Sequence, residues 1–483
     1  MTRLPTRGLA RRLTETADDM PAARVPADLW RRGRRRHRTR QVLVTAFVAL
    51  AAAVPLTALP DPAVLPAAGN AAVPGRLHQP WPWQASVEGD PRGPAALLVS
   101  GGGGYQSMDL PFTYGSRISV IGRDGSYRVL PYGNTYLQAG QDVLLSADGR
   151  RVAGDGTYLS HLGTGTGDVS VVDLGTGGER RYPGTGNIDP VAWSPDGTRL
   201  LIRRYSGPAW WSGAYDGSDT VESDNGALWL LDLGSGATTR LLDLGRTRPG
   251  RAAFSPDGRT VAVQAGRDLT LLDTTGGGRR VLTTLPAGAM LGGPWAWSTD
   301  GIGVFTIAEG CTTTCTNAER NDRTWRLTVL SSDSGAPTGR TFATFGGAAA
   351  RLAGWQRDGT AVVVRYLDEA DQQGPAYDAP DAYRAVSDVD LLALDPRGGT
   401  KVLLRKPPGV IWDLDVAADL VAAGAFGGPS PSPPVLPLAR WAATTAFVAL
   451  WLLGLAVWLV VALVRRSRGP RRTRPVSTTR IRP

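Results

Sequence analysis

The stretch VAWSPDGTRLLI, residues 191–202, decides the fold. Apolar residues stand on both sides of a Ser-Pro-Asp-Gly segment. Pro195 presets φ for the second position of a turn, and Asp196 and Gly197 suit the positions at which the chain folds back. The Asp196 carboxylate can also accept nearby backbone N–H groups. The stretch therefore predicts a strand, a tight turn and a second strand.

The same pattern recurs along the chain. Copies are AAFSPDGRTVAVQ at 252–264, WAWSTDGIGVFTI at 295–307, AGWQRDGTAVVVR at 353–365, the weaker VLLSADGRRVAGD at 143–155 and the decayed WDLDVAADLVAAG at 412–424. Second hairpins of another type lie at 168–183, 227–242, 268–283, 325–345 and 388–404, and an isolated one lies at 117–131. The repeating unit is thus four short strands, A to D, with tight turns between A and B and between C and D.

A four-stranded unit repeated every ~40–60 residues is the signature of a β-propeller blade. One such sheet cannot bury both of its faces alone, so the units must pack around a common axis. The hairpins indicate six C–D pairs, and seven A–B segments if residues 83–100 supply the first. We therefore expect an all-β fold, a six- or seven-bladed β-propeller over residues 83–425. Six blades result if the two terminal segments pair in one sheet.

The motif resembles the TolB-like (WD40-like, PD40-type) propeller repeats, whose mark is Ser-Pro-Asp-Gly after an aromatic residue. Two copies match fully, at 193–197 and 254–258, and the others keep Asp-Gly without the proline. The resemblance covers roughly residues 83–425 and implies architecture rather than function, because such propellers serve many roles. The Arg-rich, Lys-poor composition is that of a high-GC genome, and residues 7–38 loosely resemble the N-terminal regions of actinobacterial membrane proteins thought to pair with extracytoplasmic-function sigma factors. With the two apolar runs, this resemblance implies an actinobacterial, membrane-anchored type without the partner domain of TolB.

The turn residues are predicted to be structural, because each has a folding reason and a catalytic constellation would occur once. This prediction covers Asp148, Asp196, Gly197, Asp257, Gly258, Asp300 and Asp358. It extends to the acids that end the C strands, which are Asp173, Asp232, Asp273 and Asp395. Trp193, just before its turn, is expected to pack between neighbouring blades.

Two uncharged apolar runs lie near the ends of the chain, at 41–59 and 441–464. A bilayer core of ~30 Å needs ~20 apolar residues in a helix, so both runs are predicted to span a membrane. A cleavable signal peptide is the alternative for the first run.

The formal net charge of +10 is concentrated in two tails. Residues 1–40 hold 12 Arg against 4 acidic residues, and residues 465–483 hold 8 Arg and no acid. Arg-rich flanks stay cytoplasmic. We therefore expect a two-pass protein of the cell membrane with both termini inside and the propeller outside. The predicted segments are a basic head (1–40), a first membrane helix (41–59), a linker (60–82), the propeller (83–425), a Pro-rich linker (426–440), a second membrane helix (441–464) and a basic tail (465–483).

The only cysteines are Cys311 and Cys315. In the oxidising compartment expected for the propeller they are predicted to form a disulfide. Half of a metal site is the alternative, but no further cysteine exists and the three histidines, His37, His78 and His161, are scattered. No metal and no cofactor is predicted.

The long connections of the predicted blades fall between strands B and C, at 101–116, 205–226, 308–323 and 366–387. They should crowd one rim of the propeller, which is how binding surfaces are commonly built on a rigid scaffold. Their aromatic and small polar residues suit contacts to a glycan, peptide or protein. The candidate binding residues are Trp210, Trp211, Tyr215, Asp216, Tyr377, Asp378 and Tyr383. Their acids could hold Ca²⁺, but the spacing is not that of an EF-hand.

Catalytic motifs are missing from the sequence. The glycine run at 101–106 lacks the context of a phosphate loop, and no G-x-S-x-G elbow occurs. We therefore expect no enzyme but a non-catalytic binding or scaffold module for an envelope protein or glycan, with the lipid bilayer as a second partner. One alternative is a signal transducer whose residues 1–30 bind a cytoplasmic regulator such as a sigma factor. A propeller enzyme is the other, and no nucleic-acid partner is expected.

Overall fold

The computed structural model describes residues 72–77, 85–101, 106–109, 113–116, 118–130, 137–156, 167–184, 186–205, 226–245, 249–312, 315–368, 386–406, 411–428 and 438–467. The chain divides into two units, one of residues 65–435 and one formed by residues 1–64 and 436–483. The first predicted membrane run, 41–59, lies outside the described residues.

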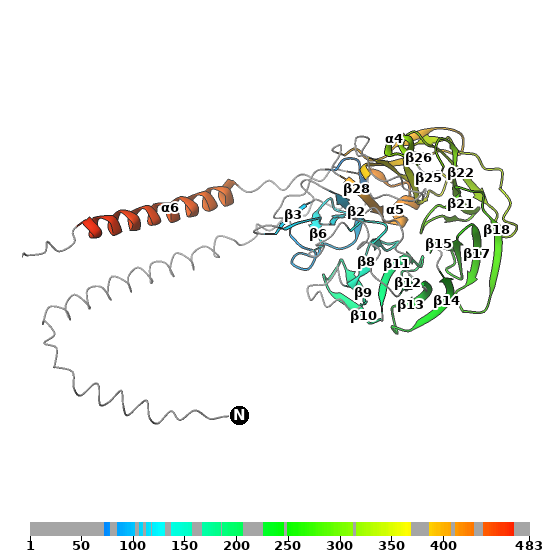
Figure 1. Cartoon of the computed structure of the whole chain (residues 1–483), viewed down its shortest axis with the longest axis horizontal. Helices are drawn as coiled ribbons and strands as arrows, with labels where there is room; N and C mark the ends of the chain where they lie inside the picture. The colour runs from blue at the N-terminus through cyan, green and yellow to red at the C-terminus, as the bar shows by residue number, and fades with distance from the viewer. Residues whose placement is uncertain are drawn as a thin grey trace, which may run out of the picture. The chain divides into compact units, whose positions relative to one another are not determined.

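The larger unit is a β-propeller whose six blades surround a common axis (Figure 1). From the axis outward, blade 1 contains β28 (Ile411–Val416), β2 (Ala95–Gly101), β5 (Ser119–Gly122) and β6 (Tyr127–Val129). Blade 2 contains β7 (Val143–Leu145), β8 (Arg151–Asp155), β9 (Val169–Asp173) and β10 (Glu179–Tyr182). Blade 3 contains β11 (Asn187–Trp193), β12 (Arg199–Tyr205), β13 (Gly226–Asp232) and β14 (Thr238–Gly245).

The remaining three blades follow in chain order. Blade 4 contains β15 (Pro249–Phe254), β16 (Thr260–Ala265), β17 (Asp268–Asp273) and β18 (Arg279–Thr284). Blade 5 has an inner strand split into β19 (Met290–Leu291) and β20 (Trp297–Ser298), then β21 (Gly301–Glu309), β22 (Thr324–Leu330) and β23 (Phe345–Gly346). Blade 6 contains β24 (Ala349–Trp355), β25 (Ala361–Asp368), β26 (Val386–Leu394) and β27 (Thr400–Val402).

The two ends of the propeller close the ring in one blade. The inner strand β28 pairs antiparallel with β2, with Leu97 opposite Val416. A short parallel pair, β1 (Val73–Pro74) with β29 (Phe426–Gly428), adds a second link between the ends. Six blades is therefore the count. The seven-bladed alternative is wrong because the 83–100 segment supplies β2, which is only the second strand of blade 1. The first strand of that blade, β28, comes from the other end of the propeller.

The decayed repeat at 412–424 also differs from expectation. Its first half is β28, but the second half is a short helix, α5 (Ala418–Ala422), rather than a strand. The strand that would follow is not needed, because β2 already occupies that place in the sheet.

The core lies between the blades. Every residue of β2 is buried, because neighbouring blades cover both faces of a central strand. Trp193 shows the packing: its side chain is 1% exposed, and its Nε1 donates to the Leu144 carbonyl of the next blade at 3.1 Å. The predicted interblade position of Trp193 is confirmed.

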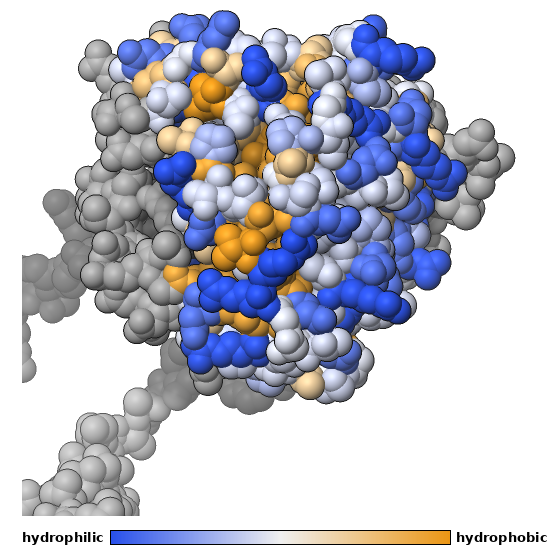
Figure 2. Space-filling view, turned by 90° about the vertical axis from the view of Figure 1, so that its right-hand side faces the viewer, coloured by the Kyte–Doolittle hydropathy of each residue, from blue (hydrophilic) through white to orange (hydrophobic). Residues whose placement is uncertain are grey.

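The outer surface on the side of β17 and β18 is mostly polar. Figure 2 shows the side of the propeller near β17 and β18, where hydrophilic residues surround small apolar patches. On β18, Arg279, Arg280 and Val281 are exposed.

The smaller unit contains the helix α6 (Leu438–Ser467). Its described side chains run from Val448 to Leu463, and all but one are exposed. A search of the described residues finds no helix that has the length and hydropathy of a membrane span.

Candidate functional site

The two rims of the propeller are built differently. One rim carries the A–B and C–D turns, and we call it the turn rim. The other carries the B–C and D–A connections, and we call it the loop rim. In every blade except blade 4 the B–C connection is long, whereas β16 and β17 are joined through Gly266 and Arg267 alone.

The turn rim has one repeated hydrogen-bond pattern. The Ser194 hydroxyl donates to Asp196 Oδ1 at 2.6 Å, and the same oxygen accepts the Thr198 N–H at 3.1 Å. The Arg199 N–H donates to Ser194 Oγ at 2.9 Å. These hydrogen bonds lower the pKa of Asp196 although partial burial opposes them. Gly197 has φ of 67°, which an L side chain rarely adopts.

Other copies repeat this geometry. Asp148 accepts from the Ser146 hydroxyl at 2.7 Å and Asp257 from the Ser255 hydroxyl at 2.6 Å. Asp358 accepts the Thr360 N–H at 2.9 Å. Positive φ recurs at the following glycine, including Gly149, Gly258 and Gly359. The structural role predicted for these residues agrees with their contacts.

Asp300 departs from the pattern. Ser298 pairs directly with Gly301 across a tighter turn, and Asp300 donates its own N–H to Ser298 Oγ at 3.2 Å. Its carboxylate forms an ion pair with Arg340 instead of capping the turn. Asp300 is therefore structural, but by a different contact from the one predicted.

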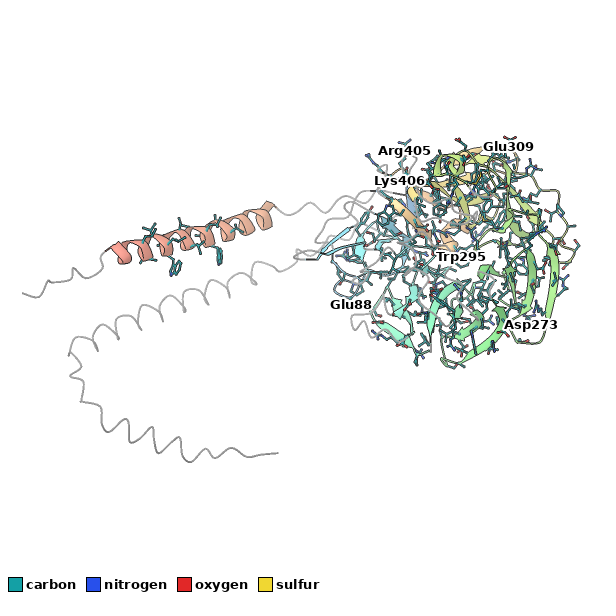
Figure 3. The ribbon with its side chains drawn as sticks, in the orientation of Figure 1. Glu88, Asp273, Trp295, Glu309, Arg405 and Lys406 are labelled. Atoms are coloured by element: carbon teal, nitrogen blue, oxygen red, sulfur yellow. A yellow bond between two sulfur atoms is a disulfide. The ribbon has the colours of Figure 1, made fainter. Side chains whose placement is uncertain are left out.

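The acids at the ends of the C strands form a second set of turns. Asp173, Asp232, Asp273 and Asp395 each accept backbone N–H groups from residues two or three positions later. Figure 3 shows Asp273 at the outer part of the ring. These carboxylates stabilise the turns, which agrees with the structural role predicted for them.

On the loop rim, the described connections carry elements that the sequence did not predict. The β2–β5 connection contains a hairpin of β3 (Gln106–Asp109) and β4 (Thr113–Ser116). The β21–β22 connection contains the helix α4 (Asn317–Asn321), which a capping box at Thr316 and Glu319 begins. The predicted disulfide between Cys311 and Cys315 is present just before it.

The helix α4 is held against blade 6 by a buried ion pair. Arg320 and Asp368 are 1% and 3% exposed, and Arg320 Nε lies 3.1 Å from Asp368 Oδ2. The Asn321 side chain adds hydrogen bonds to the Asp368 backbone at 2.9 and 2.8 Å. Asp368 falls within the connection predicted at 366–387, but it ends β25 and is buried. The predicted binding residues Trp210, Trp211, Tyr215, Asp216, Tyr377, Asp378 and Tyr383 lie outside the described residues.

Charged residues that sequence reasoning missed surround the axis toward the loop rim. Tyr366 Oη accepts from Arg351 Nε at 3.0 Å and donates to Asp413 Oδ1 at 2.8 Å. Gln141 donates to the other oxygen of Asp413 at 2.6 Å. Asp415 accepts the Leu145 N–H at 2.8 Å, and burial raises the pKa of Asp415 to about 6. This network joins blades 6, 1 and 2.

A second group lies on blades 2 and 3. Asp189 on β11 is 28% exposed and pairs with Arg203 Nη1 at 3.3 Å. Burial raises the pKa of Asp189 to about 6, although Arg203 opposes the shift. Asp142, half-buried before β7, accepts the Gln138 N–H at 2.8 Å. Burial raises its pKa to about 7, and the negative charges of Asp189 and Asp413 add to the shift. Both carboxyls could therefore exchange protons near neutral pH.

A tryptophan of blade 5 reaches across the axis to the ends of the inner strands of blades 2 and 3, near the turn rim. Trp295 lies between β19 and β20 of blade 5, yet it packs against the cluster formed by blades 2 and 3, which contains Leu144 and Trp193. Figure 3 shows Trp295 near the middle of the ring. The polar groups around the axis therefore face the loop rim. A sequence signal for two of these charged residues exists. Asp189 in NIDPVAW (187–193) and Arg351 in AARLAGW (349–355) are each the lone charge in a strand that ends in tryptophan.

Among the described residues, no group of three or more His, Cys, Asp or Glu side chains could hold a metal ion. The turns, the loop rim and the axis thus offer hydrogen-bonding and charged surfaces rather than a metal centre in the described part of the chain.

Comparison with known proteins finds no matching protein family and no matching curated protein. Solved structures do resemble the chain. An oligogalacturonate lyase in complex with manganese has a TM-score of 0.42 and 15% identity, with 68% of this chain and 78% of that chain covered. TolB from Acinetobacter baumannii has a TM-score of 0.39 and 15% identity, with 67% and 66% covered. The β-propeller domain of the Trilobed protease from Pyrococcus furiosus has a TM-score of 0.28 and 10% identity, with 65% and 69% covered.

Proposed function

We propose that this protein is a membrane-anchored, extracytoplasmic propeller that binds an envelope protein or glycan through its loop rim, without catalysis. One observation carries the proposal. The turn rim consists of short turns whose polar groups bond to one another, whereas five blades have long B–C connections on the loop rim. Elaborated loops on one face of a rigid scaffold are the usual construction of a binding surface.

The described part of the loop rim supports this role. A disulfide, a capped helix and a buried ion pair tie down the described part of the β21–β22 connection. A surface ordered before binding loses less conformational entropy when its partner arrives. The aromatic residues proposed to contact the partner, above all Trp210 and Trp211, belong to the B–C connection of blade 3.

The membrane location is proposed from the sequence together with α6. Its described apolar side chains, among them Trp451, Leu453 and Trp458, are 52%, 61% and 65% exposed. They cover fewer than the ~20 residues that span a bilayer core, but the uncharged run at 441–464 reaches that length. Alkaline extraction of host membranes tests this: the full chain should stay with the lipid, and release into the supernatant would contradict it.

Crosslinking in the host followed by mass spectrometry tests the binding function. The full chain should capture an extracytoplasmic partner, and Trp210→Ala with Trp211→Ala should lose it while expression stays unchanged. A matched control changes Arg150→Ala and Arg397→Ala, which are 71% and 83% exposed on the turn rim. Loss of partner capture in the Arg150→Ala, Arg397→Ala control, with capture kept in the tryptophan variant, would overturn the choice of rim.

The same experiment separates the binding module from a signal transducer. A chain that lacks residues 2–30 should still capture the extracytoplasmic partner. Capture of a cytoplasmic regulator by the full chain, lost on this deletion, would favour the transducer instead.

A further inference from the structure

The disulfide on the loop rim has two unequal sulfurs. Cys311 is partly exposed, whereas Cys315 is 1% exposed. Cys315 is fixed in place because the next residue caps α4: Thr316 donates its N–H to the Glu319 carboxylate at 2.8 Å. An external thiol can therefore approach Cys311 more readily than Cys315.

A buried arginine touches the inner sulfur. Arg323 is 0% exposed, and its Nη2 lies 3.1 Å from Cys315 Sγ. Its Nε donates to the Cys311 carbonyl at 2.7 Å and its Nη1 to the Ala348 carbonyl at 3.1 Å. The three contacts hold the guanidinium against the disulfide.

Among the described residues, no carboxylate forms an ion pair with Arg323. Asp368, whose charge acts on Arg323, forms its ion pair with Arg320 instead. Burial, together with the positive charge of Arg320, lowers the pKa of Arg323 to about 10. A buried cation without a counter-ion is costly, and a disulfide sulfur is only a weak acceptor. A thiolate at Cys315 would supply the missing negative charge.

We propose that Cys311–Cys315 is an exchangeable disulfide whose reduced form Arg323 stabilises, and that its reductant is a dithiol. A thiolate of the dithiol attacks Cys311 Sγ, the S–S bond breaks, and its electron pair leaves on Cys315 as a thiolate. The second thiol loses its proton to water and attacks the reductant's own sulfur in the mixed disulfide. Cys311 leaves as a thiolate and takes up a proton. Two electrons reach the protein, and the dithiol becomes a disulfide.

The physical basis of the proposal is the stability of the Cys315 thiolate as the leaving group. A thiol of lower pKa leaves faster, and a neighbouring arginine lowers the pKa of a cysteine. The attack is directed to Cys311 because that residue is the more exposed of the two, so the favoured leaving group is the one beside Arg323. Exchange would alter the connection that presents α4 on the loop rim. The proposal concerns the disulfide alone and stands whether or not the loop rim binds a partner.

Equilibration of the full-length protein with mixtures of reduced and oxidised dithiothreitol tests the proposal, with alkylation and mass spectrometry as the readout. Arg323→Gln should lower the equilibrium constant for reduction about tenfold or more, a shift of about 30 mV for two electrons. Arg326→Gln, an exposed arginine on β22, the strand that begins just after Arg323, is the matched control and should leave the equilibrium constant unchanged. An unchanged constant in Arg323→Gln, or equal shifts in both variants, would overturn the proposal.

A second measurement keeps Arg323 and so does not depend on the folding of that variant. The ultraviolet absorbance of the thiolate is followed against pH in Cys311→Ser, with the double serine variant as the blank. Cys315 should titrate below the ~8.5 of a free cysteine. In Cys315→Ser, the partly exposed Cys311 should titrate closer to that value. A Cys315 pKa at or above 8.5 would overturn the proposal even if the first experiment supported it.

Discussion

The two rims of this propeller differ in the sequence distance over which their contacts are made. On the turn rim, Ser194, Asp196 and Thr198 bond to one another within a few residues. On the loop rim, Asn321 and Asp368 are 47 positions apart, and the pair joins two blades. A local turn can form wherever its residues occur, whereas the loop rim exists only after the blades have packed. The turn rim should therefore tolerate single substitutions better than the loop rim.

The largest effect is expected at the buried ion pair of the loop rim. Asp368→Leu leaves the buried charges of Arg320 and Arg323 without this carboxylate, and should destabilise the protein by about 3–5 kcal/mol. Denaturant unfolding measures the change. Asp243→Ala removes an exposed ion pair with Arg240 and should cost less than about 1 kcal/mol. Equal costs for the two variants would mean that the buried ion pair contributes no more to stability than an exposed one.

A second pair of variants sharpens the comparison within the turn rim itself. Gly149 and Gly197 have nearly the same φ, 68° and 67°, so alanine costs each the same backbone strain, about 1 kcal/mol. A Cβ at Gly197 meets nothing within 4 Å, whereas one at Gly149 would lie 2.1 Å from the Ala95 carbonyl oxygen. Gly149→Ala should therefore have the lower thermal midpoint. The reverse order would show that β2 does not lie against this turn.

Loss of a single turn carboxylate should have a smaller effect. Asp196→Ala removes the hydrogen bonds from Ser194 and Thr198 at an exposed site, and should cost about 0.5–1.5 kcal/mol. Asp196→Asn keeps an oxygen acceptor and should recover part of that loss in the same unfolding measurement. A cost as large as that of Asp368→Leu would contradict the local character of the turn.

A pH dependence of stability is expected from a single carboxyl near the axis, that of Asp142. The pKa of Asp142 is raised to about 7 in the folded protein, above the ~3.9 of an unfolded aspartate. The folded state therefore binds more protons between these values, so its stability falls as pH rises from about 4 to 7. Asp142→Asn should flatten this slope in unfolding measured across that range. An unchanged slope would mean that Asp142 does not titrate there.

The sequence predicted the repeated unit because its turns are encoded locally. A Ser, an Asp and a Gly at fixed spacing satisfy one another, as at Ser255, Asp257 and Gly258. It also predicted the disulfide between the only two cysteines. The charges around the axis were missed because each stands alone in its own strand, and Arg351 meets Asp413 only after two blades come together. The helix α4 was missed because its five residues are too few to show a helical period.

The sequence by itself determined the four-stranded unit, its tight turns and the apolar strands between them, because these depend on φ preferences and hydrogen bonds among near neighbours. The tertiary structure decided the number of blades, since only the pairing of β28 with β2 shows that the two ends share one sheet. It also placed Trp295 across the axis and Arg323 beside Cys315. Such contacts join residues from different blades or from opposite ends of a connection, and no local pattern encodes them.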